Sequence, residues 1–97
     1  MATFEWDPIK AQSNLSKHGV RFEDAVLVWQ DPFYVTYPDR VVDHELRYHA
    51  VGVVGLVTFL LVVHIYVEGD DERVRIVSAR RATPQERKTY EQDLPGA

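Results

Sequence analysis

The chain contains no cysteine among its 97 residues. Without cysteine there can be no disulfide framework and no thiolate metal site, so the fold does not depend on an oxidising compartment. Long apolar runs are also lacking, because the longest, from Leu56 to Ile65, is interrupted by Thr58 and His64 and is too short to cross a bilayer. The N-terminus has no basic region followed by an apolar stretch, as a secretion signal would have. These absences predict a cytoplasmic protein without a membrane segment.

What the chain does contain is enough apolar residues for one core. A hydrophobic fraction of 45% over 97 residues supports a single compact domain and leaves no room for a second one. We expect this domain to cover residues 1–94 and residues 95–97 to form a flexible tail.

Charge is distributed unevenly along the chain, whose formal net charge is −4. Residues 1–46 carry four basic and eight acidic groups, whereas residues 73–90 carry six basic groups and one acid. Such a division suits a protein that binds an anion at one place without adhering to polyanions everywhere. A solvated basic strand edge and helix face would produce the same pattern, and charge alone does not separate the two explanations.

Two helices are predicted near the N-terminus, after a short edge strand at residues 3–6. Asp7 and Pro8 provide a cap acceptor and a proline at the first helical position, and Gly19 is the expected left-handed terminator. Apolar residues at helical spacing over 22–29 predict a second helix that ends near Asp31. These helices should form a hairpin on one side of the domain.

Four strands and a final helix are predicted to follow. The strands cover residues 33–37, 47–53, 56–67 and 73–80, with a polar loop over 38–45. The run at 56–67 is apolar on both faces, which is typical of a central strand covered by helices. Thr83-Pro84-Gln85-Glu86 forms a capping box that starts the last helix. Helices grouped before an antiparallel meander indicate an α+β fold.

The last strand is the most basic part of the chain. Strict alternation divides it into two sets, one with Val74, Ile76, Ser78 and Arg80 and the other with Arg73, Arg75 and Arg81. Either Arg80 or Arg81 should therefore face a helix-covered side, where a guanidinium persists only if it is paired or kept for a ligand. An ion pair with Glu86 and a ligand site both fit. Arg47 could approach Arg80 across the sheet, depending on a register that the sequence does not supply.

Histidine and tryptophan offer weaker indications of chemistry. The histidines, at positions 18, 44, 49 and 64, show no spacing typical of a zinc site, so no metal is predicted. His64 lies in an apolar central strand, where a core histidine is more common than a catalytic one, although histidine suits proton transfer near neutrality. Trp6 and Trp29 could stack on bases or belong to the core. No phosphate loop, nucleophile elbow or pair of catalytic carboxylates is found.

Several blocks of the sequence occur together in one known family. In chain order they are FEWDP (4–8), NLSKHGV (14–20), FEDA (22–25), DP (31–32), ELR (45–47) and RIVSARRAT (75–83), followed by Glu86, Arg87 and Tyr90. Together they resemble the BrnT family, the toxins of a bacterial type II toxin–antitoxin system. The resemblance covers nearly the whole chain in the family's order and spacing, and as a set it is highly specific.

The resemblance implies a RelE-like α+β fold, with an antiparallel sheet, an N-terminal helical hairpin and a C-terminal helix. It also implies an endoribonuclease that needs neither metal nor cofactor and inhibits translation and growth. In such families the RNA 2′-hydroxyl attacks the phosphodiester and leaves a cyclic phosphate, so the protein positions RNA, moves protons and stabilises charge. The implied partner is a BrnA-type antitoxin with a ribbon-helix-helix domain, through which alone operator DNA is bound.

Candidate site residues follow from matching positions. The resemblance assigns Arg80, in the Ser-Ala-Arg motif, and Arg47, after the acidic loop, to the scissile phosphate, with His64 as the candidate general acid or base. Candidates for RNA contacts are Lys17, His18, Arg75 and Arg81, of which His18 could equally be structural.

The chain departs from the family at one position. Many relatives have an arginine shortly after the position of His64, whereas this chain has Val67 there. The toxin would then be weak, or Arg73 or Arg75 would replace the missing arginine. Two hypotheses stay open: an active ribonuclease toxin, and a catalytically silent homologue that acts as an antitoxin-binding co-repressor. Residues 33–37 fit either a homodimer interface or the core.

Overall fold

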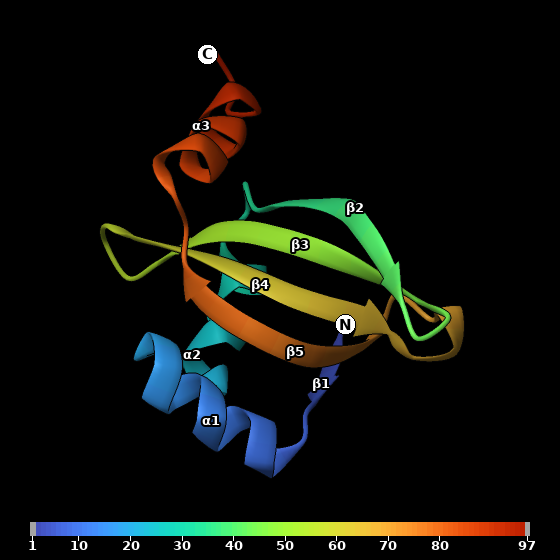
Figure 1. The fold of residues 1–97 in the computed structure, drawn as a ribbon. Helices are drawn as coiled ribbons and strands as arrows, with labels where there is room; N and C mark the ends of the chain where they lie inside the picture. The colour runs from blue at the N-terminus through green and yellow to red at the C-terminus, as the bar shows by residue number, and fades with distance from the viewer. Residues whose placement is uncertain (1, 97) are drawn as a thin grey trace.

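The computed structural model describes residues 2–96, so Ala97 of the expected tail lies outside the described residues. Over this range the chain forms an α+β fold around one sheet (Figure 1). The elements are β1 (Thr3–Glu5), α1 (Pro8–His18), α2 (Phe22–Ala25), the 3₁₀ helix η1 (Val26–Gln30), β2 (Val35–Val42), β3 (Glu45–Val54), β4 (Thr58–Tyr66), the 3₁₀ turn η2 (Val67–Gly69), β5 (Arg73–Arg81) and α3 (Pro84–Gln92).

The strand order β1-β5-β4-β3-β2 confirms the predicted meander from β2 to β5 and the predicted edge position of β1. The sheet is mixed rather than wholly antiparallel, because β1 pairs with β5 in parallel. Connecting parallel neighbours requires a long crossover, and the chain between these two strands includes the helices and the rest of the sheet.

Local capping signals are confirmed at both long helices. The Asp7 carboxylate accepts a hydrogen bond from the backbone N–H of Ile9 at 2.8 Å, and Gly19 ends α1 with a φ of 68°. Thr83 and Glu86 form the reciprocal capping box at the start of α3. The predicted second helix is divided, because α2 has only four residues and continues as the 3₁₀ helix η1.

Strand β2 is longer than predicted and takes up most of the expected polar loop. The connection to β3 is a tight turn at Asp43 and His44, both of which have positive φ. Pro38 fits within β2 because this strand is at the sheet edge, where a missing N–H removes no ladder bond. The pairing with β3 is irregular between Pro38 and Val41, which places Asp39 in a locally distorted segment.

The two faces of the sheet are covered unequally. Figure 1 shows α1 and α2 on one side and α3 on the other, near the end of β5. The larger core lies under α1 and α2 and includes Phe22, Val28 and Val62. The second core is small and consists of Tyr90 of α3 with Val51 and Leu61, together with partly buried neighbours. Much of the second face is therefore not covered by a helix.

A β-bulge in β5 overturns the predicted alternation. Val63 of β4 pairs with Ser78 and the next residue, His64, pairs with Ile76, so Val77 is left without a partner. An unpaired residue shifts the side-chain alternation by one position. Arg80 consequently lies on the opposite face from Ile76, and the placement predicted from strict alternation is wrong.

Asn14 of α1 holds this part of β5 in place. Its side-chain N–H groups donate to the carbonyl oxygens of Val20 (2.9 Å) and Ala79 (2.8 Å), and its oxygen accepts from the N–H of Ala79 at 3.0 Å. The paired β1 residues reach only as far as Arg75 on β5. The Asn14 amide thus supplies Ala79 with the hydrogen bonds that a neighbouring strand would give.

His64 lies in the larger core and has no exposed surface. Its ring contacts Trp29 edge-on at 4.9 Å between ring centres and stacks with Tyr48 at 5.9 Å. Nδ1 is 3.3 Å from the Val62 carbonyl oxygen, while Nε2 has no hydrogen-bond partner within residues 2–96. Burial, and to a smaller extent the charge of His49, lowers the pKa of His64 from 6.5 to about 4.

We expect Asn14→Ala to destabilise the protein by roughly 2–4 kcal/mol, because it leaves the buried N–H and C=O of Ala79 unpaired. Urea unfolding followed by circular dichroism measures the loss. The control is Gln12→Ala, an exposed substitution on the same helix that should change stability by less than about 0.5 kcal/mol. Equal stability of the two variants would contradict the role given to Asn14.

His64 should make the protein less stable as the pH falls from 6.5 to 4. The unfolded chain binds the proton near pH 6.5 and the folded chain only near pH 4, so acid favours unfolding, by on the order of 3 kcal/mol over this window. Urea unfolding at pH 7.5 and 4.5 measures the difference, which His64→Phe should largely remove. Histidine NMR titration of the folded protein provides a direct check, and a His64 midpoint near 6.5 would refute the prediction.

Candidate active site on the open face of the sheet

The face of the sheet opposite α1 and α2, which α3 covers only at one end, carries polar side chains among apolar ones; we call it the open face. The pairings Tyr37 with His49, His49 with Val63, and Val63 with Ser78 form one row across four strands. Arg80 lies two residues beyond Ser78 on β5, next to α3. Alternation places Arg47 of β3 on the same face as His49.

Arg80 forms a two-pronged ion pair with Glu86 of α3. Nη1 donates to Oε1 at 2.7 Å and Nη2 to Oε2 at 2.8 Å, while Nη1 also donates to the carbonyl oxygen of Arg81 at 3.2 Å. These bonds leave Nε–H and one Nη2–H of the five guanidinium N–H groups without a partner in the described chain. Arg80 therefore keeps two donors for a ligand.

The carboxylate of Glu86 is itself held in position. Besides Arg80, it accepts a hydrogen bond from the backbone N–H of Thr83 at 2.9 Å, within the capping box. The hydrogen bonds from Arg80 are the main reason that the pKa of Glu86 falls to about 2, although burial acts in the opposite direction. The same pair raises the pKa of Arg80. The ion pair that the sequence suggested is thus present, charged and oriented by the start of α3.

His49 and Asp39 form a second pair on the open face. Nε2 of His49 lies 3.3 Å from Oδ2 of Asp39, and the His49 ring meets the Tyr37 ring edge-on at 5.5 Å. Burial raises the pKa of the Tyr37 phenol, Glu86 and Asp39 add to this effect, and Arg80 opposes it. Tyr37 therefore lies within electrostatic range of both pairs.

Sequence reasoning missed this cluster, since it considered His49 only as a metal ligand. The available signal was the spacing of Arg47 and His49, two residues apart on one strand, which places both side chains on one face. Asp39 could not be found in this way, because it lies in the irregular part of β2.

Arg47 is half-buried and makes no hydrogen bond or ion pair with any residue between 2 and 96. It lies four residues before Val51, which is aligned with Leu61 and Arg80 across the sheet. The rise per residue along a strand and the spacing between neighbouring strands place the Cα atoms of Arg47 and Arg80 roughly 16 Å apart. The two arginines thus do not touch, but they lie toward opposite ends of the open face.

The predicted RNA contacts lie in three places. Lys17 and His18 border a hollow of about 190 Å³ at the sheet edge, which Ser78 also lines. Arg75 is paired with Glu5 of β1, at 2.9 Å between Nη2 and Oε2. Arg81 is aligned with Leu60, a residue of the larger core, so it lies on the opposite face from Arg80.

His64 is not part of the open face. It is fully buried in the larger core beneath Trp29, on the opposite side of the sheet from Arg80 and Arg47. A general acid or base must come within hydrogen-bonding distance of its substrate. The geometry therefore gives no support to the prediction that His64 transfers the proton.

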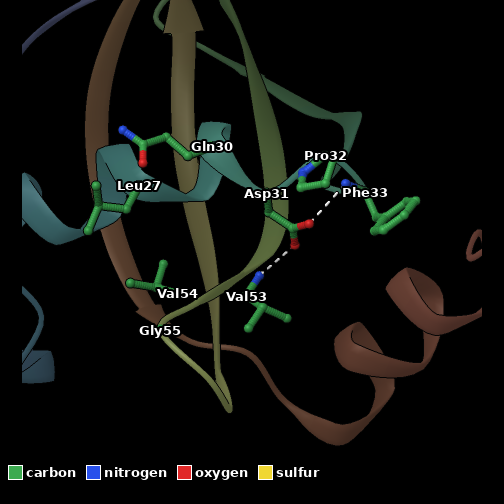
Figure 2. Close-up of a pocket in the computed structure, with 8 residues that line it drawn as sticks. All are labelled: Leu27, Gln30, Asp31, Pro32, Phe33, Val53, Val54 and Gly55. Carbon is green, nitrogen blue, oxygen red and sulfur yellow. Dashed lines mark hydrogen bonds between the residues drawn. The ribbon is translucent and has the colours of Figure 1, made fainter.

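A hollow of about 450 Å³ lies beside the end of η1 (Figure 2). Its carboxylate, Asp31, accepts hydrogen bonds from the N–H groups of Phe33 and Val53, both at 2.9 Å, as Figure 2 shows, and from the Tyr90 hydroxyl at 2.8 Å. Burial alone would raise the pKa of Asp31, but these bonds outweigh it and the pKa is lowered. Asp31 thus fastens α3 to the sheet and has a structural role.

Between residues 2 and 96, no three or more histidine, aspartate or glutamate side chains converge in a way that could hold a metal ion. Within the same part of the chain, no helix combines the length and apolar character needed to span a membrane.

Comparisons with known proteins agree with the fold. A model of the family described as "Ribonuclease toxin, BrnT, of type II toxin-antitoxin system" matches residues 6–86. The crystal structure of the Brucella abortus ribonuclease toxin BrnT is similar, with a TM-score of 0.66 and 24% sequence identity over 86% of this chain and 99% of that chain. No curated protein sequence matches. Since the family match includes most of the sheet and helices, this chain belongs to the BrnT family of ribonuclease toxins of type II toxin–antitoxin systems.

Proposed function

We propose that this chain is an active, metal-independent endoribonuclease toxin that inhibits translation and growth by cleaving RNA on the open face of its sheet. The observation that carries this proposal is the unpaired donor capacity there. Arg47 has no partner within residues 2–96, and Arg80 retains two N–H groups despite its bond to Glu86. Cleavage by the 2′-hydroxyl of the RNA needs such donors, because negative charge grows on the phosphate oxygens in the transition state.

Arg80 and Arg47 differ in the way they would bind phosphate. The free Nε–H and Nη2–H of Arg80 lie on one edge of the guanidinium and match two phosphate oxygens. Arg47 would contribute charge at the other end of the face. Lys17 and His18, which share a hollow with Ser78, would extend the positive surface to the sheet edge. Arg75 would contribute less, because Glu5 already neutralises it, and Arg81 could contact only RNA that wraps around the edge.

The chain's partner would be a BrnA-type antitoxin with a ribbon-helix-helix domain, in keeping with the family's type II toxin–antitoxin system. Operator DNA would be bound only through that antitoxin, since the net charge of −4 disfavours direct binding to duplex DNA. We also propose that this α+β fold is of the RelE-like kind, because its meander is combined with N-terminal helices and a C-terminal helix.

A catalytically silent, antitoxin-binding co-repressor is the second candidate. Two observations favour it: Glu86 neutralises Arg80, and Val67 stands where the family resemblance leads one to expect an arginine. The free edge of Arg80 favours activity instead, because Glu86 orients the guanidinium without using all its donors.

Arg80→Lys and Arg47→Ala should each reduce RNA cleavage by about 10²–10³-fold, since each removes a donor for the phosphate charge. Lysine keeps the charge of Arg80 but loses the planar fork. The measurement is cleavage of a defined RNA by purified, antitoxin-free protein in EDTA, with mapping of the RNA ends. Arg21→Ala is the control, because Arg21 is exposed beside α1 and α2. A wild-type protein that leaves RNA intact would support the silent co-repressor.

Glu86→Gln should separate RNA binding from cleavage. Glutamine preserves the capping box, so α3 should stay folded, while one negative charge is removed from beside Arg80. We expect KM to fall severalfold because RNA binds more tightly, and kcat to fall about tenfold because Arg80 loses its fixed orientation. A rise in kcat would instead mean that Glu86 blocks the site.

A further inference from the structure

We propose that His49, held by Asp39, is the general base that takes the proton from the RNA 2′-hydroxyl, and that Tyr37 donates a proton to the departing 5′-oxygen. This inference rests on the ribonuclease function proposed above and assigns its proton transfers, which His64 is too deeply buried to perform.

The His49 ring is oriented by its neighbours. Its Nε2 lies 3.3 Å from the Asp39 carboxylate, so a proton on Nε2 leaves the lone pair of Nδ1 free to accept another. The side chain of His49 is 18% exposed, and the Tyr37 ring packs against its edge. A ring that is positioned by a carboxylate and still open to solvent has the arrangement that a general base requires.

The other histidines lack this combination. His18 lines the hollow at the sheet edge and His44 lies in the turn between β2 and β3. Over residues 2–96, His49 is the one histidine within 4.0 Å of a carboxylate oxygen. His49 also lies in the same row of the sheet as Ser78. Ser78 precedes Arg80 by two residues on β5.

The proposed reaction conserves protons. Nδ1 of His49 accepts the 2′-hydroxyl proton as O2′ attacks phosphorus, and Asp39 stabilises the imidazolium that forms. The bond from phosphorus to O5′ breaks, and O5′ takes the phenolic proton of Tyr37. The products are a 2′,3′-cyclic phosphate and a 5′-hydroxyl. Afterwards His49 releases its proton to solvent, and Tyr37 regains one from solvent.

Other titratable and charged groups lie near His49. Strand β2 contributes Tyr37, Asp39 and Arg40, whose Nε lies 3.6 Å from the Asp39 oxygen that faces His49. Strand β3 contributes Arg47, and the Arg80–Glu86 pair acts on Tyr37 from β5 and α3. His64 of β4 lies on the other side of the sheet and is affected by the charge of His49. A pH–rate profile must therefore be compared between matched variants, not read from one protein.

The test measures single-turnover RNA cleavage by purified full-length variants across pH, together with affinity for 2′-O-methyl RNA, which cannot react. We expect His49→Gln to cleave at least about 100-fold more slowly, to lose the acidic limb of the profile and to bind the unreactive RNA within twofold of wild type. Asp39→Asn should slow cleavage at least about tenfold while binding the unreactive RNA as wild type does, because the imidazolium that forms on His49 loses the carboxylate that orients and stabilises it. His44→Asn, in the nearby turn, is the control and should match wild type.

A substrate with sulfur in place of the 5′-bridging oxygen tests Tyr37 separately. Sulfur leaves without protonation, so Tyr37→Phe should be slow on normal RNA and close to wild type on this substrate.

The outcomes distinguish the two levels of the proposal. If wild type cleaves and His49→Gln is within threefold of it, the assignment to His49 is wrong while the ribonuclease function stands. If wild type does not cleave, the proposed function itself fails. If His49→Gln does not fold, Asp39→Asn decides, and single-turnover cleavage by Asp39→Asn at the wild-type rate overturns the assignment.

Discussion

The amide of Asn14 takes the place of a neighbouring strand beside Ala79, and the position of Arg80 on the open face depends on its hydrogen bonds. The paired residues of β1 stop at Arg75, so the second half of β5 would otherwise have a free edge. Asn14 satisfies both backbone groups of Ala79 and also binds Val20 just beyond α1. Because Arg80 is the next residue, its backbone is fixed by a side chain of α1.

The two faces of the sheet differ in how they are covered. On one face, α1 and α2 bury a continuous apolar core that includes His64. On the other, α3 covers only one end, where Tyr90 reaches Asp31 and thereby holds Glu86 near Arg80. A charged group half-shielded from water interacts more strongly than one on the surface. The partial cover by α3 thus strengthens the electrostatic interactions of Arg80 and Glu86, while the rest of the open face stays accessible.

The parts of the structure that local chemistry decides were predictable from the sequence. Asp7, Gly19 and the Thr83–Glu86 box set helix ends through contacts only a few residues apart. The unpredicted parts depend on pairing between distant residues. The bulge at Val77 follows from how β5 pairs with β4, and it moved Arg80 to the face opposite the one that alternation assigned. His64 was proposed from the family resemblance, whereas the strand pairing places His49, aligned with Val63, on the open face.

Because position 67 is a valine, any arginine that the site needs there must come from a neighbouring position. Val67 is the first residue after β4, and Arg73 and Arg75 lie on the neighbouring strand, so either could in principle replace an arginine at position 67. Both are occupied, since Glu5 contacts each of them and Glu68 also contacts Arg73. Over residues 2–96, Arg47 is the arginine of the open face without a carboxylate partner. An active enzyme with valine at position 67 would therefore take the uncompensated arginine charge of its open face from Arg47.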